Sequence, residues 1–239
     1  MAQDTLIILH GWTRHHERWQ TLIKILRHYG YQVVYLKLPG FTSLPLSRVW
    51  TIIDYAGWIK FFLDEQKIKT FSLIGHSNGG RIAAFFAAQN PKGLKKLILI
   101  DSAGVKNKYS FKRTILFPLA KIGNLFFAIP GIAYFRDIAR SWLYRIAGEK
   151  DYFEAEPKLA KTMVGLINLD LVPYLGKIAH PVLLIWGAQD VTTPLKDALI
   201  FKKEVKKARL TVFPGGKHTL PYDKPLLVAR EIIDFLKSN

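Results

Sequence analysis

The chain has 239 residues, and 49% of them are apolar, which fits one large α/β domain or a domain with an insertion. It contains no cysteine, which excludes disulfides, thiolate metal sites and a cysteine nucleophile. The formal net charge of +17 favours anionic partners, and peripheral contact with an anionic membrane is one option. No nucleic-acid-binding motif accompanies the charge, so we expect no nucleic-acid partner.

The first residues are predicted to form a strand and not a targeting segment. The apolar run covers only residues 6–9, and no basic region precedes it. The most apolar longer stretch, 115–135, is interrupted by two prolines, a lysine and an asparagine, so we predict no membrane span. We therefore expect a cytoplasmic protein.

Short apolar runs alternate with helical patterns along most of the chain. Strands are predicted at 5–9, 32–36, 70–74, 95–100, 181–186 and 209–213. Helices are predicted at about 16–28, 50–66, 79–89, 195–206 and 223–237. This alternation predicts an α/β fold, with a mostly parallel, six-stranded sheet that has helices on both faces.

The alternation is interrupted once, between the fourth and fifth strands. About 80 residues there lack a strand pattern and are aromatic, basic and helical in periodicity. We interpret residues 105–175 as a helical cap inserted into a core formed by 1–104 and 176–239. Because ligands of open α/β sheets bind at the carboxyl ends of strands, such an insertion is placed to cover the site.

The third predicted strand leads into Gly75-His76-Ser77-Asn78-Gly79, a G-x-S-x-G pattern between a strand and a helix. In that context the serine lies on a tight turn and projects above the edge of the sheet, as a nucleophile does. The two flanking glycines provide the room that such a turn needs. Capping of the following helix is the alternative role for Ser77.

Two further polar residues follow predicted strands. Asp190 comes just after the fifth strand and His218 just after the sixth. A serine nucleophile needs a base and a group that orients the base, and these positions would supply both. Asp101, also at a strand end, is a rival for the orienting acid, and His76 is a rival for the base.

An oxyanion hole needs two N–H groups that converge on one point. Asn78 opens the helix after the serine, so its N–H has no partner within that helix. The loop after the first strand, His10-Gly11-Trp12, would supply the second donor from Trp12.

These motifs, in this order, resemble those of the α/β hydrolase superfamily, in its capped esterase and C–C hydrolase type. The motifs are the HG turn at 10–12, LPGF at 38–41, GHSNGG at 75–80, LILIDSAG at 97–104, WGAQDVTTPL at 186–195 and GGKH at 215–218. The resemblance covers essentially the whole chain and implies a core that lacks the first two strands common in the family. It also implies the roles of nucleophile for Ser77, base for His218 and orienting acid for Asp190, with Trp12 and Asn78 as oxyanion donors.

The expected function is hydrolysis of carboxylic esters with small to medium apolar acyl groups, through an acyl-enzyme. Alternatives are a C–C hydrolase of meta-cleavage-type diketone acids, a lipase-like enzyme whose lid at 115–135 rests on membrane, and a non-catalytic binder of acidic ligands. The substrate-binding candidates are Arg81, Phe117, Phe127 and Trp142. No metal-ligand spacing is present, and no cofactor is expected. The sequence does not indicate an oligomeric state.

Overall fold

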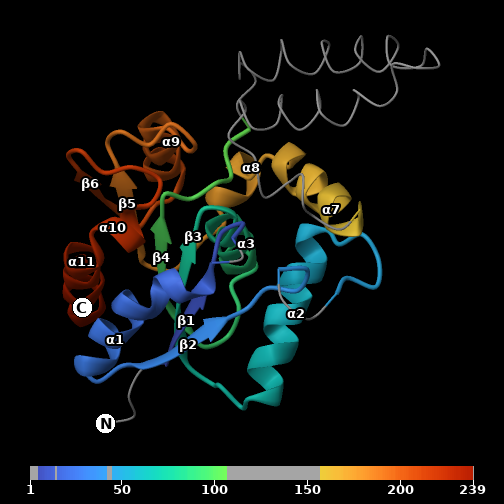
Figure 1. Ribbon diagram of the computed structural model, residues 1–239, viewed down its shortest axis with the longest axis horizontal. Helices are drawn as coiled ribbons and strands as arrows, with labels where there is room; N and C mark the ends of the chain where they lie inside the picture. The colour runs from blue at the N-terminus through green and yellow to red at the C-terminus, as the bar shows by residue number, and fades with distance from the viewer. Residues whose placement is uncertain (1–4, 14, 42–44, 107–156, 239) are drawn as a thin grey trace, which may run out of the picture.

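The computed structural model describes residues 5–13, 15–41, 45–106 and 157–238. Six parallel strands form one sheet in the order β2-β1-β3-β4-β5-β6 (Figure 1). The strands are β1 (Thr5–Leu9), β2 (Gln32–Leu36), β3 (Phe71–His76), β4 (Leu94–Ile100), β5 (Val182–Gly187) and β6 (Ala208–Phe213). The predicted fold class and all six predicted strands are confirmed, and the strand ends shift by at most two residues.

The helices cover both faces of the sheet. They are η1 (His16–Trp19), α1 (Gln20–His28), α2 (Ile52–Glu65), α3 (Asn78–Ala87), α7 (Pro157–Asn168), α8 (Val172–Leu175), α9 (Leu195–Glu204), α10 (Leu220–Asp223) and α11 (Pro225–Lys237). In Figure 1, α1 and α11 lie on one side of the sheet and α2 lies on the other.

Alternate residues of the strands enter two separate hydrophobic clusters. In β1, Ile7 and Leu9 join the cluster under α2, α3, α7 and α9, whereas Leu6 and Ile8 join the cluster under α1 and α11. All five residues of β1 are buried, as expected for a central parallel strand that is covered on both faces.

Two helix ends show local chemistry that the apolar pattern does not carry. The helix predicted at 223–237 begins two residues later, as α11, because Pro225 lacks an N–H group and suits a first helical position, and the short helix α10 precedes it. At the start of α2, Thr51 accepts a hydrogen bond from the N–H of Asp54, and the Asp54 carboxylate accepts one from the N–H of Thr51. This capping box sets where α2 begins.

The chain segments at the start and near the end of the predicted cap lie side by side. The Leu171 N–H donates to the Gly104 carbonyl oxygen at 2.8 Å, and the Lys106 N–H donates to Asp170 Oδ1 at 3.3 Å. Helices α7 and α8 fall within 105–175, yet their buried residues belong to the hydrophobic cluster on that face of the sheet. The predicted lid at 115–135 and the candidates Phe117, Phe127 and Trp142 lie outside the described residues.

Among the described residues, no helix has both the length and the hydropathy needed to cross a bilayer.

Candidate active site

Ser77 lies in a sharp turn between β3 and α3. Its φ of 53° and ψ of −120° are unusual for a residue with a side chain and carry a cost on the order of 1–3 kcal/mol. A Cβ atom on Gly75 would lie 2.6 Å from the Cα of Gly80, and one on Gly79 would lie 2.3 Å from the carbonyl oxygen of Leu9. The G-x-S-x-G pattern therefore follows from the close packing of this turn against α3 and β1.

Backbone hydrogen bonds hold this turn at the carboxyl edge of the sheet. The Ser77 N–H donates to the Ile100 carbonyl oxygen at 3.2 Å, and the Ser77 carbonyl oxygen accepts from the Ala103 N–H at 2.9 Å. The strand order reverses between β1 and β3, so Ser77 lies at the topological switch point, where α/β proteins bind ligands.

Ser77, His218 and Asp190 form one hydrogen-bonded chain. His218 follows β6, and its Nε2 lies 2.9 Å from Ser77 Oγ. Its Nδ1 lies 2.8 Å from Asp190 Oδ2, after β5. Because the carboxylate only accepts, Nδ1 carries the proton, and Nε2 is left to accept the Ser77 hydroxyl proton. The order Asp190–His218–Ser77 suits removal of a proton from the serine.

Asp190 is buried and fully hydrogen-bonded. Its Oδ1 accepts from the N–H groups of Thr192 at 2.7 Å and Thr193 at 3.0 Å, and its Oδ2 lies 2.7 Å from the Thr193 hydroxyl. Burial acts to raise the pKa of Asp190, but the hydrogen bond and charge of His218, with the Thr193 bonds, outweigh burial and hold the pKa below its usual range. Asp190 is therefore ionised when it faces the imidazole.

Thr193 is a site residue that the motif reasoning missed. Besides Asp190, its hydroxyl lies 3.0 Å from the Asp101 carbonyl oxygen and 3.3 Å from His218 Nδ1. The sequence does carry a signal for this contact, because a threonine three residues after an aspartate can close a local side-chain turn.

Asp101 lies behind Asp190 and not beside His218. It is fully buried, has a φ of 43°, and its Oδ1 accepts from the Gly187 N–H at 2.8 Å. Burial raises the pKa of Asp101 to about 8, and the charge of Asp190 adds to the rise. Asp101 is therefore mostly protonated at pH 7, beside the ionised Asp190.

His76 contacts the backbone of His218, and its side chain does not occupy the position of the base. Its Nε2 lies 2.8 Å from the His218 carbonyl oxygen, so this nitrogen carries the proton and donates. Burial lowers the pKa of His76 to about 3, and the ring is neutral. Its ring also packs edge-on against Trp19 and Tyr222. His76 thereby ties the end of β3 to the loop that carries His218.

The Gly11–Trp12 peptide lies beside Ser77. A Cβ atom on Gly11 would be 2.9 Å from Ser77 Cβ, so only glycine fits there. His10 Nδ1 donates to the Gly11 carbonyl oxygen at 2.6 Å, while its Nε2 accepts from the Leu38 N–H at 3.0 Å. The Gly11 carbonyl and the Trp12 N–H belong to one planar trans peptide and point in opposite directions. The hydrogen bond from His10 to this carbonyl therefore orients the Trp12 N–H away from His10. Asn78, buried at the first position of α3, follows Ser77 directly.

The remaining predicted contact, Arg81, is buried on α3 with 5% of its surface exposed. Within the described ranges, no group of three or more His, Asp or Glu side chains could hold a metal ion.

Comparison with known proteins gives relatives along nearly the whole chain. A hydrolase of uncharacterised role from Bacillus subtilis, YugF, is 26% identical and covers 99% of this chain and 91% of that protein. The 2-hydroxy-6-oxo-6-phenylhexa-2,4-dienoate hydrolase of Comamonas testosteroni is also 26% identical, with coverages of 99% and 88%. The monoacylglycerol lipase ABHD6 of Mus musculus is 24% identical, with coverages of 99% and 76%.

The fold is shared with solved structures at lower identity. An esterase from Exiguobacterium antarcticum superposes with a TM-score of 0.78 at 19% identity and covers 98% of this chain and 92% of that one. A family model described as the alpha/beta hydrolase fold matches residues 4–127, which is more than half of the chain. The chain therefore belongs to the alpha/beta hydrolase fold family and is a hydrolase.

Proposed function

We propose that the chain is a serine hydrolase that cleaves carboxylic esters with small to medium apolar acyl groups. Ser77 is the nucleophile, His218 the general base and Asp190 the orienting acid. The observation that carries this proposal is the unbroken hydrogen-bonded chain, with 2.9 Å between Ser77 Oγ and His218 Nε2 and 2.8 Å between His218 Nδ1 and Asp190 Oδ2. A serine hydroxyl is a weak nucleophile unless a neighbouring base takes its proton.

In the first step Ser77 Oγ attacks the ester carbonyl carbon while its proton passes to His218 Nε2. The ionised Asp190 stabilises the imidazolium that forms, and the hydrogen bonds from Thr193 keep its carboxylate in place. His218 then returns the proton to the departing alcohol, which leaves an acyl-Ser77 ester. Water repeats the sequence on this intermediate and releases the acid.

The tetrahedral oxyanion would be held by the N–H groups of Trp12 and Asn78. The support is local: Gly11 is in contact with Ser77, and Asn78 begins a helix whose first N–H groups have no intrahelical acceptor. Removal of one such donor typically costs a factor of 10²–10³ in kcat.

The ester assignment is tested with nitrophenyl acyl esters of increasing chain length. We expect turnover in the wild type and a loss on the order of 10⁶ in kcat for Ser77→Ala. Labelling by a fluorophosphonate should follow the same pattern. Ser47→Ala, at an exposed serine, is the matched control and should behave as the wild type. Labelling of Ser77→Ala at the wild-type rate would eliminate Ser77 as the nucleophile.

The relatives favour a second candidate reaction at the same site, hydrolysis of a C–C bond in a dienoate. One curated relative is named for such a substrate and another for a monoacylglycerol ester, at similar identity. Arg81, one turn beyond Ser77, or a cap arginine would then hold the substrate carboxylate. Comparison of kcat/KM for a 2-hydroxy-6-oxohexadienoate and for a nitrophenyl ester distinguishes the two, since the preferred substrate should be favoured by several powers of ten.

We also propose that residues 105–175 form a unit inserted into the core. The two hydrogen bonds that join Gly104 to Leu171 and Lys106 to Asp170 support this boundary, because they connect the start of the unit to a segment near its end. The packing of α7 and α8 in the sheet cluster indicates that the last part of this unit is anchored to the core.

A further inference from the structure

The amino edge of the sheet, opposite the edge that carries Ser77, is built from short loops rich in lysine. Four neighbouring strands, β3 to β6, begin there, after the loops 66–70, 88–93, 176–181 and 205–207. These loops and the second residue of β4 carry a set that we call the amino-edge lysines: Lys67, Lys69, Lys92, Lys95, Lys177, Lys206 and Lys207. All seven are exposed, and the four loop sequences contain no aspartate or glutamate.

The four loops are in contact and form one continuous surface. The Asn90 side chain donates to the Lys177 carbonyl oxygen at 3.0 Å and accepts from the Ala179 N–H at 3.2 Å. The Val182 N–H donates to the Lys207 carbonyl oxygen at 3.0 Å. Gly93 is so close to the 66–70 loop that a Cβ atom would lie 2.0 Å from the Lys69 carbonyl oxygen. With strands about 4.8 Å apart, the row spans roughly 15 Å.

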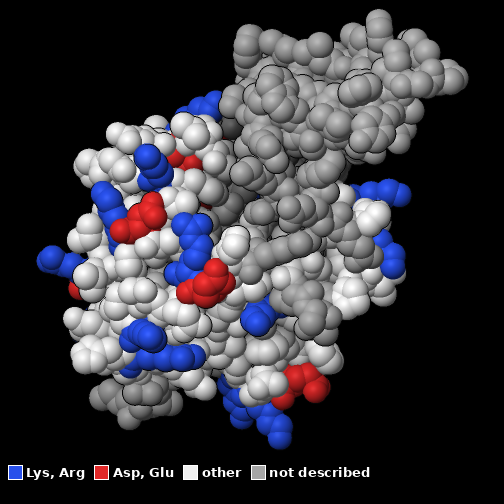
Figure 2. Space-filling view, viewed as in Figure 1, with Lys and Arg blue, Asp and Glu red and all other residues white. Residues whose placement is uncertain are grey.

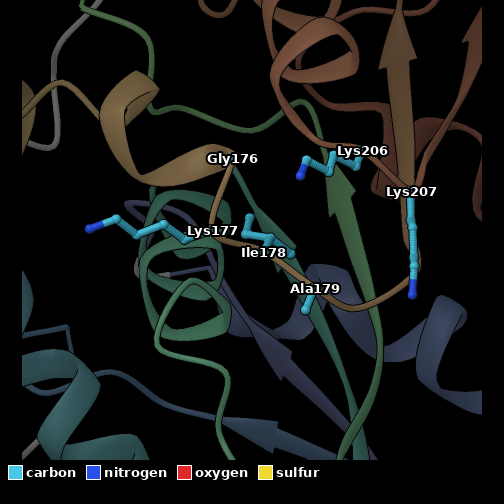
Figure 3. Close-up of a pocket in the computed structure, with 6 residues that line it drawn as sticks. All are labelled: Gly176, Lys177, Ile178, Ala179, Lys206 and Lys207. Carbon is cyan, nitrogen blue, oxygen red and sulfur yellow. The ribbon is translucent and has the colours of Figure 1, made fainter.

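The carboxylates next to these loops along the chain are Asp64 and Glu65 at the end of α2 and Glu204 at the end of α9. Within the described part of the chain, no ion pair joins a carboxylate to any amino-edge lysine. Figure 2 shows one face of the molecule, on which red acidic side chains lie beside blue basic ones. Between the third and fourth loops, a shallow hollow of about 230 Å³ is lined by Gly176, Lys177, Ile178, Ala179, Lys206 and Lys207. Figure 3 shows Lys206 reaching toward Gly176, with Lys177 and Lys207 extending to either side.

We propose that the amino-edge lysines dock the protein on an anionic phospholipid surface. The row consists of lysines, which act as point charges toward any anion, whereas Arg209, at the second residue of β6, is paired with Glu231 at 3.6 Å. The four loops contain no phenylalanine, tyrosine or tryptophan on which a nucleic-acid base could stack, and their one aromatic ring is the partly buried His180. Such an array suits a broad anionic surface better than a single nucleic-acid strand. In this orientation Ser77, about 20 Å away along β3, faces the aqueous side.

The competing explanation is that these lysines only stabilise the fold. Helices α2, α3, α8 and α9 all end at this edge, and cations near a helix C-terminus are favourable. That explanation predicts a loss of stability when the lysines are neutralised and no role in membrane binding.

The test is co-sedimentation with vesicles of phosphatidylcholine alone or with about one third phosphatidylglycerol, at ~0.05 M and ~0.5 M salt. The protein should bind only the anionic vesicles and should dissociate at high salt. Each lysine near an anionic surface contributes a factor of about five in binding. The variant Lys95→Gln, Lys177→Gln, Lys206→Gln, Lys207→Gln should therefore bind on the order of several hundredfold more weakly.

A charge-matched control replaces four exposed lysines elsewhere with glutamine: Lys24, Lys60, Lys158 and Lys161. It has the same net charge and should lose less than about tenfold in binding, because its changes lie off the docking edge. Circular dichroism and melting temperature establish that both variants fold.

Three results would overturn the proposal. The first is an absence of wild-type binding to anionic vesicles, and the second is an equal loss in the control, which would mean that net charge alone drives binding. The third is tighter binding to a DNA duplex than to vesicles, measured by fluorescence anisotropy and abolished by the same four substitutions, which would assign the edge to nucleic acid.

Discussion

The two edges of one parallel sheet are used in opposite ways. At the carboxyl edge, the side chains of Asp101 and Asp190 are buried and those of Ser77 and His218 are partly buried, and each is held by specific partners. At the amino edge, the amino-edge lysines are exposed and share one sign of charge. We therefore expect the effect of a substitution at the carboxyl edge to depend on which residue is changed. At the amino edge we expect it to depend on how many charges are removed.

After removal of the Ser77 hydroxyl itself, the largest effect is expected from Asp190→Asn. The amide cannot stabilise an imidazolium as the carboxylate does and favours the wrong imidazole tautomer, so kcat should fall on the order of 10⁴-fold. Steady-state kinetics on a nitrophenyl ester measure the loss, with Asp223→Asn as the control. A loss below about tenfold would mean that Asp190 does not orient the base.

His76 offers a sharper test of positioning at the same edge. His76→Leu removes the N–H that holds the His218 carbonyl oxygen, and we expect kcat to fall by about 10²-fold, because small displacements of a base are costly. His76→Gln places an amide N–H near the position of Nε2 and should recover most of the activity. Equal losses in the two variants, at equal melting temperatures, would show that this hydrogen bond does not position the base.

Asp101→Asn should change how stability depends on pH. The pKa of Asp101 is raised to about 8 in the folded protein, so between its ordinary value of 3.8 and about 8 the unfolded chain releases a proton that the folded chain retains. The wild type therefore loses stability through this group as pH rises, with a limiting slope of about 1.4 kcal/mol per pH unit. Asparagine is uncharged throughout this pH range and removes that loss.

The measurement is urea unfolding of both proteins at pH about 5, 6.5 and 8. The stability difference should grow in favour of the variant as pH rises through this window. A difference that does not change with pH would contradict a neutral Asp101.

The smallest effect concerns the amino edge. Neutralising Lys95, Lys177, Lys206 and Lys207 should change the free energy of unfolding by less than about 1 kcal/mol and in the stabilising direction at low salt, since like charges repel. The difference should disappear at ~0.5 M salt because these charges are exposed to solvent. Thermal unfolding at the two salt concentrations measures this effect. A clear loss of stability would favour the helix-end explanation for these lysines.

Much of the fold was predictable because a parallel α/β protein encodes its strands as nearly continuous apolar runs. The run at 182–187, for example, is buried at every residue, so its pattern has no competing interpretation. Pro225 and the Thr51–Asp54 box shift helix boundaries through local hydrogen-bond chemistry that apolar periodicity does not report.

The site was predictable where a residue follows a strand directly. Ser77, Asp190 and His218 were expected to lie together for this reason, and the structure places them within hydrogen-bonding distance. The supporting contacts of Thr193, His76 and His10 were not predicted, because they depend on backbone atoms of other segments brought close by folding. The protonated state of Asp101 likewise depends on burial and on a neighbour 89 residues away in sequence.

The positive φ of Ser77 lowers the stability of the folded protein, and the proposed chemistry requires a serine at this position. Glycine would adopt that dihedral without strain, so a Ser77→Gly protein should be inactive and yet harder to unfold than the Ser77→Ala protein, by about 1 kcal/mol. On stability alone glycine would be the better residue at this turn, and the strain at Ser77 is the cost of holding a hydroxyl where the proposed reaction needs it.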